Sequence, residues 1–284
     1  MKLSVTYFPE DLHHPAVKAL VGDAIATKEC PWGSELSERY LTTFSGLSGC
    51  AVRLSFSFTD KQCEQYSHFI LKPKHVIRET DAVSAANAAH SEQAPVIRED
   101  EFGVYRARSK VFVAAVKPQA DRIWAMEYSE SYLVATHWFT LMLERFSGFN
   151  AIPVLHYKTS QVVDGWHSFS SSHWLDRLVI DDSLELAPGR NGKKIMRPLG
   201  LLAASANDLK SLPDIARCPG ANSSGDSLYI VNQSAWQCWR ECGINSFWPY
   251  PLLNEDSQHY QRYRALIDDV RSRIAIHSAN VIRM

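Results

Sequence analysis

The stretch SLYIVNQSAWQCWRECGINSFWPYPL, residues 227–252, changes from one kind of secondary structure to another twice. SLYIV is a short apolar run of the kind that forms a compact strand. Asn232 follows it as a candidate helix N-cap, and NQSAWQCWRECG predicts a short helix that ends at Gly243. The extended, aromatic segment INSFWPYPL comes next. This order predicts strands and helices that are mixed along the chain and pack on each other.

The rest of the chain has the same mixed character. MKLSVTYF at 1–8 and CAVRLSFSF at 50–58 alternate apolar and polar residues, which predicts two half-buried strands. Residues 80–93 are small and polar, and they fit either a surface helix or a mobile loop. Helices are also expected at 14–26, 34–43, 129–146 and 256–277, and strands at 67–79, 104–116 and 151–157.

We therefore expect an α+β fold with mixed or antiparallel sheets packed with helices. The strands at 1–8 and 51–71, which flank a helix, suggest a ferredoxin-like N-terminal part. A soft boundary near residue 150 divides the chain into one unit at 1–150 and a second at 151–284. Because strands and helices are mixed on both sides of this boundary, a single domain is the alternative.

Composition and charge are those of an ordinary globular protein. Of the 284 residues, 45% are hydrophobic and 21% are charged, which argues against a disordered chain. The formal net charge is −1, whereas a dedicated nucleic-acid binder usually has an excess of basic residues. The N-terminus has no apolar run typical of a signal peptide, and the longest apolar patch, 132–143, is too short to cross a bilayer. We expect a cytoplasmic protein that contacts no membrane.

The six cysteines contain no CxxC pair. Cys238 and Cys242 are four residues apart on a predicted helix, but no second pair at close spacing completes a zinc site. We therefore expect reduced thiols, several of them packed in the core, and neither a metal nor a cofactor. The remaining four are Cys30, Cys50, Cys63 and Cys218.

The stretch DGWHSFSSSHW, residues 164–174, combines the residue types of a catalytic site. If the protein is an enzyme, Asp164, His167 and His173 are the candidate acid, base and orienting groups. No GxSxG nucleophile elbow surrounds its serines, and no fixed metal-ligand spacing is present. The favoured alternative is therefore a serine-rich turn held between Trp166 and Trp174.

Two further groups are candidate binding residues. Tryptophan and tyrosine dominate the hot spots of protein interfaces, so the aromatic cluster near the C-terminus is either core packing or part of a partner-binding surface. The candidate partner-binding residues are Trp166, His167, His173, Trp174, Trp236, Trp239, Trp248 and Tyr250. Basic residues with a nearby histidine are the candidate contacts of a nucleic acid, and these are Lys72, Lys74, His75, Arg106, Arg108 and Lys110.

The order PLGLLAASANDLKSLPDIARCPG, then SLYIVNQSAWQCWRECGINSFWPYPL, resembles the C-terminal part of bacterial polymorphic-toxin immunity proteins, over about residues 197–251. The strand of this pattern is 228–231, its helix 234–242, its stop Gly243 and its closing segment 247–251. The resemblance implies a fold that binds a cognate toxin, with no catalytic residues.

We therefore expect a non-enzymatic protein-binding inhibitor, a toxin-neutralising immunity protein of a bacterial competition system. The alternative is a nucleic-acid-binding or nucleic-acid-processing protein of a bacterial defence system, of the metal-independent RNA endonuclease type. A histidine would then act as acid or base, and the candidates are His75, His156, His167 and His173. A continuous basic groove with a histidine at its centre would favour this alternative, and scattered histidines beside an aromatic patch would favour the inhibitor.

Overall fold

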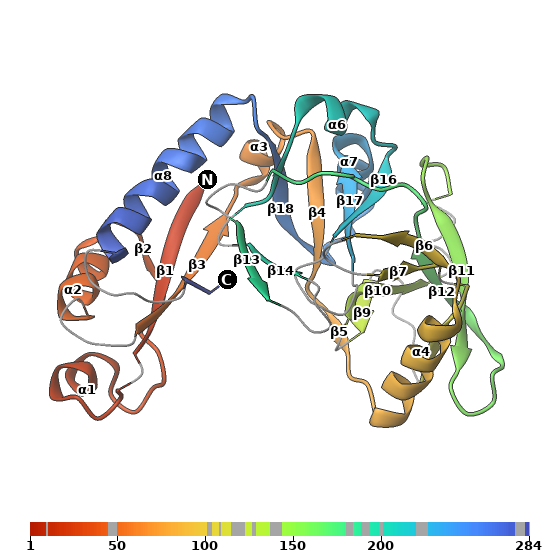
Figure 1. Ribbon diagram of the computed structural model, residues 1–284, viewed down its shortest axis with the longest axis horizontal. Helices are drawn as coiled ribbons and strands as arrows, with labels where there is room; N and C mark the ends of the chain where they lie inside the picture. Colours follow the sequence, from red (N-terminus) through yellow and green to blue (C-terminus); the bar gives the residue numbers. More distant parts are fainter. Residues whose placement is uncertain are drawn as a thin grey trace.

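The computed structural model confirms the α+β class. Three larger sheets, of four, five and six strands, lie side by side along the long axis of the molecule, and helices pack against them (Figure 1). Two additional pairs of strands are also present. The structure describes residues 1–9, 11–44, 50–100, 104–107, 109–114, 123–126, 129–136, 144–179, 184–188, 194–198, 201–219, 227–275 and 282–283.

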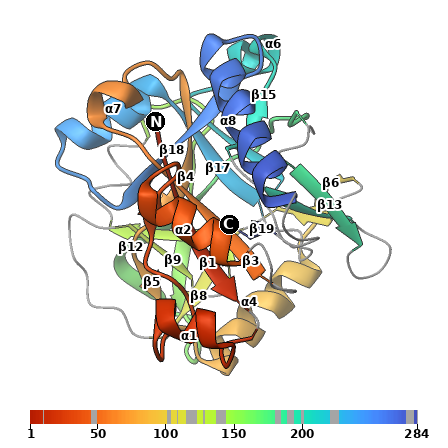
Figure 2. The same ribbon diagram turned by 90° about the vertical axis from the view of Figure 1, so that its left-hand side faces the viewer.

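The four-stranded sheet contains the two alternating strands predicted from the sequence. Its elements are β1 (Lys2–Pro9), β2 (Cys30–Pro31), β3 (Cys50–Ser57) and β19 (Ile282–Arg283), with helices α1 (Pro15–Val21), α2 (Glu35–Phe44) and α8 (Gln258–Ala275). β1 and β3 pair antiparallel, with Tyr7 opposite Val52, so their apolar positions point to the same face. The α2 and α8 helices cover this face, where Tyr7 contacts the ring of Tyr40 and Phe56 contacts that of Tyr263 (Figure 2).

The N-terminal part does not have the ferredoxin-like arrangement. That arrangement contains split βαβ units, whose two strands run parallel. Here β2 lies directly beside β1 and antiparallel to it. The strands predicted at 50–58 and within 67–79 are present but lie in different sheets, and the helix α3 (Asp60–Cys63) lies between them. Thr59 and Gln62 form a capping box that starts this helix, a local signal that the strand prediction did not weigh.

The five-stranded sheet joins an early strand, at residues 68–73, to four strands between residues 203 and 254. It has the order β15-β18-β4-β17-β16, and its strands are β15 (Ala203–Ala204), β18 (Phe247–Asn254), β4 (His68–Pro73), β17 (Ser227–Asn232) and β16 (Ile215–Pro219). β4 is the central strand, and it pairs antiparallel with both β17 and β18. A division of the chain at residue 150 would therefore cut through this sheet.

The helix predicted after SLYIV is present as α7 (Gln233–Glu241). The side-chain oxygen of Asn232 accepts a hydrogen bond from the backbone N–H of Ala235, which is the expected N-cap. Gly243 follows the helix with a φ of 76°, a backbone conformation that glycine adopts without steric cost. A second helix, α6 (Ala206–Ser211), begins at Ser205 in the same way.

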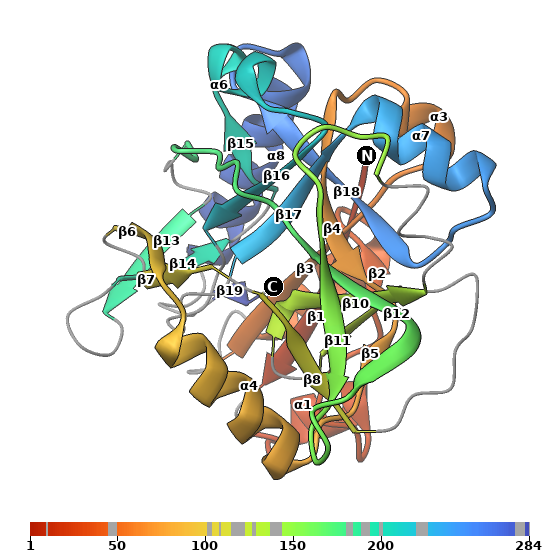
Figure 3. The ribbon, with the colours of Figure 1, turned by 90° about the vertical axis from the view of Figure 1, so that its right-hand side faces the viewer.

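The six-stranded sheet lies at the other end of the molecule, where the helix α4 (Asp81–Gln93) packs beside it (Figure 3). Its strands, in spatial order, are β5 (Val76–Ile77), β9 (Ile123–Met126), β10 (Ser129–Thr136), β12 (Val162–Ser170), β11 (Asn150–His156) and β8 (Val111–Val113). The buried residue Ser246, which precedes β18, connects this sheet to the five-stranded sheet. Its hydroxyl accepts from the N–H of Ile123 and its carbonyl from the N–H of Lys74.

The prediction of a buried helix at 129–146 is wrong over 129–136, because this segment is the strand β10. β10 lies between β9 and β12, and consecutive residues from Leu133 to Thr136 are all buried. A strand that is covered on both faces has no alternation, so its apolar run cannot be told from a buried helix by period alone. Residues 137–143 of the predicted helix lie outside the described residues.

Two other segments are also clarified by the structure. Residues 80–93 form a helix, α4 (Asp81–Gln93), with Thr80 as its N-cap. The single strand expected at 104–116 is two short strands, β7 (Val104–Arg106) and β8, and they belong to different sheets. β7 pairs with β6 (Val96–Glu99), and β13 (Leu184–Pro188) pairs with β14 (Lys194–Pro198). None of the described helices is long and apolar enough to span a membrane.

His68, at the start of β4, gives the fold a dependence on pH. Burial lowers the pKa of His68 from 6.5 to about 4. As the pH falls below 6.5, the imidazole of His68 takes up a proton in the unfolded chain but not in the folded chain. The contribution of His68 to stability is therefore complete above pH 6.5 and is lost progressively toward pH 4. Between pH 7 and pH 4 we expect the free energy of unfolding to fall by about 2–3 kcal/mol more in the natural protein than in a His68→Asn variant. Urea denaturation at the two pH values measures this difference, and equal losses in both proteins would refute it.

Candidate functional site

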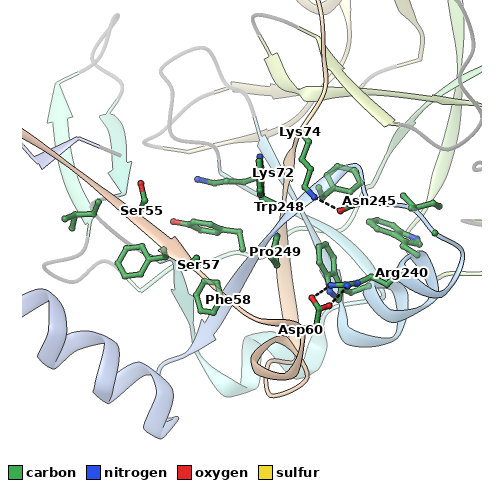
Figure 4. Close-up of a pocket in the computed structure, with 18 of the residues that line it drawn as sticks. Ser55, Ser57, Phe58, Asp60, Lys72, Lys74, Arg240, Asn245, Trp248 and Pro249 are labelled. Carbon is green, nitrogen blue, oxygen red and sulfur yellow. Dashed lines mark hydrogen bonds and ion pairs between the residues drawn. The ribbon is translucent and has the colours of Figure 1, made fainter. Parts of the chain in front are cut away.

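A pocket of about 840 Å³ lies between β3, β4, α7 and β18 (Figure 4). This volume is within the range of about 300–1,000 Å³ that is usual for ligand sites. Its lining contains four basic side chains, Arg53, Lys72, Lys74 and Arg240, and two acidic ones, Glu29 and Asp60. Half of the remaining lining residues are aromatic, so the pocket combines an excess of positive charge with flat apolar surfaces.

The pairing of β18 with β4 brings lysines and aromatic rings together. Trp248 lies opposite Lys72 in the register, and Tyr250 lies opposite Ile70. Residues 70, 72 and 74 therefore share one face of the sheet with Trp248 and Tyr250. The ammonium group of Lys72 lies 4.0 Å from the ring centroid of Tyr250, and that of Lys74 lies 4.7 Å from the ring centroid of Trp248. Both distances are within the range of cation–π contacts.

The charged groups at the other side of the pocket hold each other in place. The two terminal guanidinium nitrogens of Arg240 donate to the two carboxylate oxygens of Asp60, at 2.5 and 2.7 Å. This pairing lowers the pKa of the Asp60 carboxyl. Lys74 donates a hydrogen bond to the side-chain oxygen of Asn245. Burial and the nearby charge of Arg240 lower the pKa of Lys74. An anion bound between Lys74 and Arg240 would therefore relieve a repulsion that the pocket contains when empty.

The aromatic cluster predicted at the C-terminus divides into packing residues and exposed residues. Trp236 stacks on Phe69 with ring centroids 4.7 Å apart, and Trp239 packs against Phe247. Both tryptophans are buried, as is Tyr250, and burial raises the pKa of the Tyr250 hydroxyl well above its usual value. Trp248 is the exception, because 59% of its surface is exposed. It is the residue of this cluster that a partner can reach most readily.

The outer edge of β18 is blocked against pairing with another strand. The N–H of Leu253 donates to the carbonyl of Leu202, on the side of β18 where β15 lies. Because backbone groups alternate in direction along a strand, the odd-numbered residues of β18 direct their N–H and C=O groups to this side. Pro249 and Pro251 are odd-numbered and have no N–H to offer there. The edge next to the pocket therefore lacks these two donors, and recognition in the pocket depends on side chains.

The stretch 164–174 is a strand and not a turn over most of its length. β12 extends through Ser170, and Trp166 is buried against Trp124, with ring centroids 5.1 Å apart. Asp164 and His167 are three residues apart on this strand, which directs them to opposite faces. Trp166 and Ser168 both point to the buried side of the strand. The sequence did not reveal this alternation, because one of the two buried positions is a serine, whose hydroxyl donates to a backbone carbonyl.

Trp174 belongs to a different structural cluster from Trp166. Its ring lies 4.5 Å from the guanidinium carbon of Arg217 and 5.4 Å from that of Arg98, and it contacts the ring of Tyr105. The N–H of Arg217 donates to the carbonyl of His173, and the N–H of Leu175 donates to the carbonyl of Arg217. These contacts fasten the segment to β16. The structure thus gives Trp174 a packing role, and the residues of 164–174 do not line the pocket.

The five candidate nucleic-acid contacts that the structure describes do not come together in one groove. Lys72 and Lys74 line the pocket, but Arg106, on β7, donates to the backbone carbonyl of Ala94. Lys110 lies over the ring of Phe112, beside β8. His75 contacts the ring of Trp124, and Arg108 lies outside the described residues. The candidate histidines His75, His156, His167 and His173 are not among the residues that line the pocket.

The described residues contain no group of three histidines, cysteines or carboxylates placed to hold a metal ion. Five cysteines have free thiols, and Cys30, Cys63 and Cys218 are buried, as expected of packed thiols. Burial raises the pKa of Cys63 to about 11 and that of Cys218 to about 12. Since the thiolate is the form that binds metals and attacks substrates, these two thiols are poor candidates for either role.

Several residues of the pocket were not identified from the sequence. Arg53 belongs to the polar face of the best alternating strand, which was a usable signal. Asp60 and Arg240 are 180 residues apart, and nothing local marks them as a pair. A comparison of the sequence with models of known protein families found no match, and a comparison with curated proteins found none either. The proposals for function therefore rest on the geometry of the pocket and on the resemblance of 197–251.

Proposed function

We propose that this protein is a non-enzymatic inhibitor that binds a protein partner through the pocket, and that the partner is a toxin of a bacterial competition system. The pocket supports binding to a partner segment that is acidic and partly apolar. The resemblance of residues 197–251 to immunity proteins supports the class of partner. The segment that carries the resemblance includes α7 and β18, which supply much of the pocket lining.

The observation that carries this proposal is the position of Trp248. It is the exposed tryptophan of the pocket, and Lys74 lies over its ring. Tryptophan is enriched in interface hot spots because it buries a large area at a small cost in side-chain entropy. A ring that is already held by a neighbouring cation loses even less freedom on binding. The basic residues around it favour an acidic partner and increase the rate of association.

The nucleic-acid alternative has one observation in its favour, the lysines that lie beside aromatic rings in the pocket. Proteins that bind single strands use such a combination. Two observations weigh against it. The other basic candidates lie elsewhere, so no continuous basic groove is formed by the described residues, and the candidate histidines are scattered. We therefore prefer the protein-binding function.

The proposal can be tested by capture of the partner from the native cells with a tagged protein and chemical crosslinking. We expect one protein to be captured, and we expect its toxic activity to fall in proportion to the inhibitor added. The double variant Lys72→Glu, Lys74→Glu should weaken binding about 100-fold, because two attractive contacts become repulsive. Binding is measured by titration calorimetry with the purified partner.

A matched control is Lys158→Glu, which makes the same charge change at an exposed lysine beside Tyr157, far from the pocket lining. This variant should bind as the natural protein does. Recovery of RNA in place of a protein would overturn the proposal in favour of the nucleic-acid alternative. A partner whose binding is unaffected by the double variant would overturn the assignment of the pocket.

A further inference from the structure

We infer that the pocket selects an extended partner segment in which two acidic side chains are separated by one residue. This inference rests on the proposed function and names the chemistry of the segment that the pocket receives. It follows from the spacing of Lys72 and Lys74, from the blocked edge of β18, and from the pairing of Arg240 with Asp60.

The spacing of Lys72 and Lys74 matches the spacing of alternate side chains in an extended peptide. Lys72 is in β4 and Lys74 directly follows the strand, where its N–H still donates to the carbonyl of Ser246 on the β18 side. The extended backbone therefore continues to Lys74, and the two side chains leave the same face about 6.6 Å apart. An extended peptide repeats its side chains with the same period, and the side chains of residues i and i+2 also leave one face about 6.6 Å apart. Of two carboxylates at alternate positions, one can therefore approach Lys72 beside Tyr250 and the other can approach Lys74 beside Trp248. Two adjacent acidic residues would point to opposite sides of the segment.

The pocket can hold such a segment only through side chains. Pro249 and Pro251 remove backbone donors from the edge of β18, so a partner strand cannot extend the central sheet there. The segment must then be recognised through side chains on the face of the sheet. Lys72 and Lys74 are both held beside rings, those of Tyr250 and Trp248, which limits the freedom that each ammonium group loses on binding.

The basic side chains of the pocket suit carboxylates better than phosphates. A guanidinium group that is open at both nitrogens is the side chain best suited to hold a phosphate with two hydrogen bonds. In this pocket Arg240 already donates from both terminal nitrogens to the two oxygens of Asp60. The lysines act as point charges and suit single carboxylate oxygens. The acidic groups Asp60 and Glu29 in the lining also disfavour a long polyanion such as RNA.

The test uses two synthetic peptides of equal length and composition, one with the repeat Asp-Val-Asp-Val and the other with Asp-Asp-Val-Val. Valine keeps both in extended conformations. Each peptide is labelled at its N-terminus and titrated with the intact protein, and binding is followed by fluorescence anisotropy. We expect the alternating peptide to bind at least about tenfold more tightly than the adjacent one, and we expect each of Lys72→Gln and Lys74→Gln to remove about tenfold of its affinity. Lys158→Gln is the matched control and should leave it unchanged.

The outcomes separate this inference from the proposed function. Equal binding of the two peptides, or binding of neither at millimolar concentration, overturns the inference, and inhibition of a captured partner through Lys72 and Lys74 would leave the proposed function standing. Preferential binding of the alternating peptide, without any inhibited protein partner, supports the inference on ligand chemistry and contradicts the proposed function. A single-stranded oligothymidylate of the same length is the third probe. Tighter binding of this probe, lost in the same lysine variants, would overturn both.

Discussion

Replacement of Gly148 by alanine is expected to lower the free energy of unfolding by about 2–5 kcal/mol. Gly148 has a φ of 82°, a conformation that costs other residues about 1–2 kcal/mol. A Cβ atom at this position would lie 2.1 Å from the backbone oxygen of Ile215 and 2.9 Å from the ring of Pro213. Relief of such a contact requires a shift of backbone, which adds about 1–3 kcal/mol. Urea denaturation followed by circular dichroism measures the total.

Gly165 provides the matched control for this prediction. It has a similar φ of 77°, but a Cβ atom there would meet nothing within 4 Å. Gly165→Ala should therefore cost only the conformational part, about 1–2 kcal/mol. Equal stability of the two alanine variants would contradict the close approach of Gly148 to the backbone of Ile215 in β16.

Replacement of Trp174 by alanine should destabilise the protein by about 3 kcal/mol. The indole ring fills the space between Arg217, Arg98 and Tyr105. Its removal leaves a cavity and takes a contact from Arg217, which is 1% exposed and cannot turn to water. Large-to-small changes of packed aromatic residues cost about 3–5 kcal/mol, and Trp174 is only partly exposed, so the lower end of this range applies.

Trp248→Ala is the companion experiment, since it makes the same chemical change at the exposed tryptophan of the pocket. We expect it to change the free energy of unfolding by less than about 1 kcal/mol, the value of its contact with Lys74. Trp248→Ala should weaken partner binding strongly. Trp174→Ala should leave the affinity of the folded molecules for the partner unchanged, because Trp174 does not line the pocket. The opposite pattern would move the binding surface to residues 164–174.

Local periodicity explains which parts of the fold were predictable. The strands at 1–8 and 50–58 alternate because one face is buried and the other is not, so their apolar residues reveal them. The helix α7 carries its own start and stop, Asn232 and Gly243. By contrast, β10 is covered on both faces and has no period to read, and β12 buries the serine Ser168 among apolar residues.

The candidate site was predictable only in pieces. The sequence separately pointed to the lysines near 72 and to the aromatic residues near 248, and it assigned them to two different functions. The pairing of Trp248 with Lys72 unites them, and this register joins segments from opposite parts of the chain. Residues 164–174 resemble a catalytic site in composition because catalytic residue types are also common in polar packing. Composition alone could not distinguish these two origins.

The central position of β4 has a consequence for the order of folding. β4 is made early in synthesis, but both of its neighbours, β17 and β18, are made after residue 226. Its long-range pairing implies slow, late formation of the central sheet, since contacts between distant segments carry the largest cost of loop closure. Until β17 and β18 arrive, the apolar side chains of β4, which include Phe69 and Leu71, have no strand beside them. A nascent chain therefore cannot display the pocket, and we expect chains that end before residue 227 to be targets for chaperones and proteases and to be unable to bind.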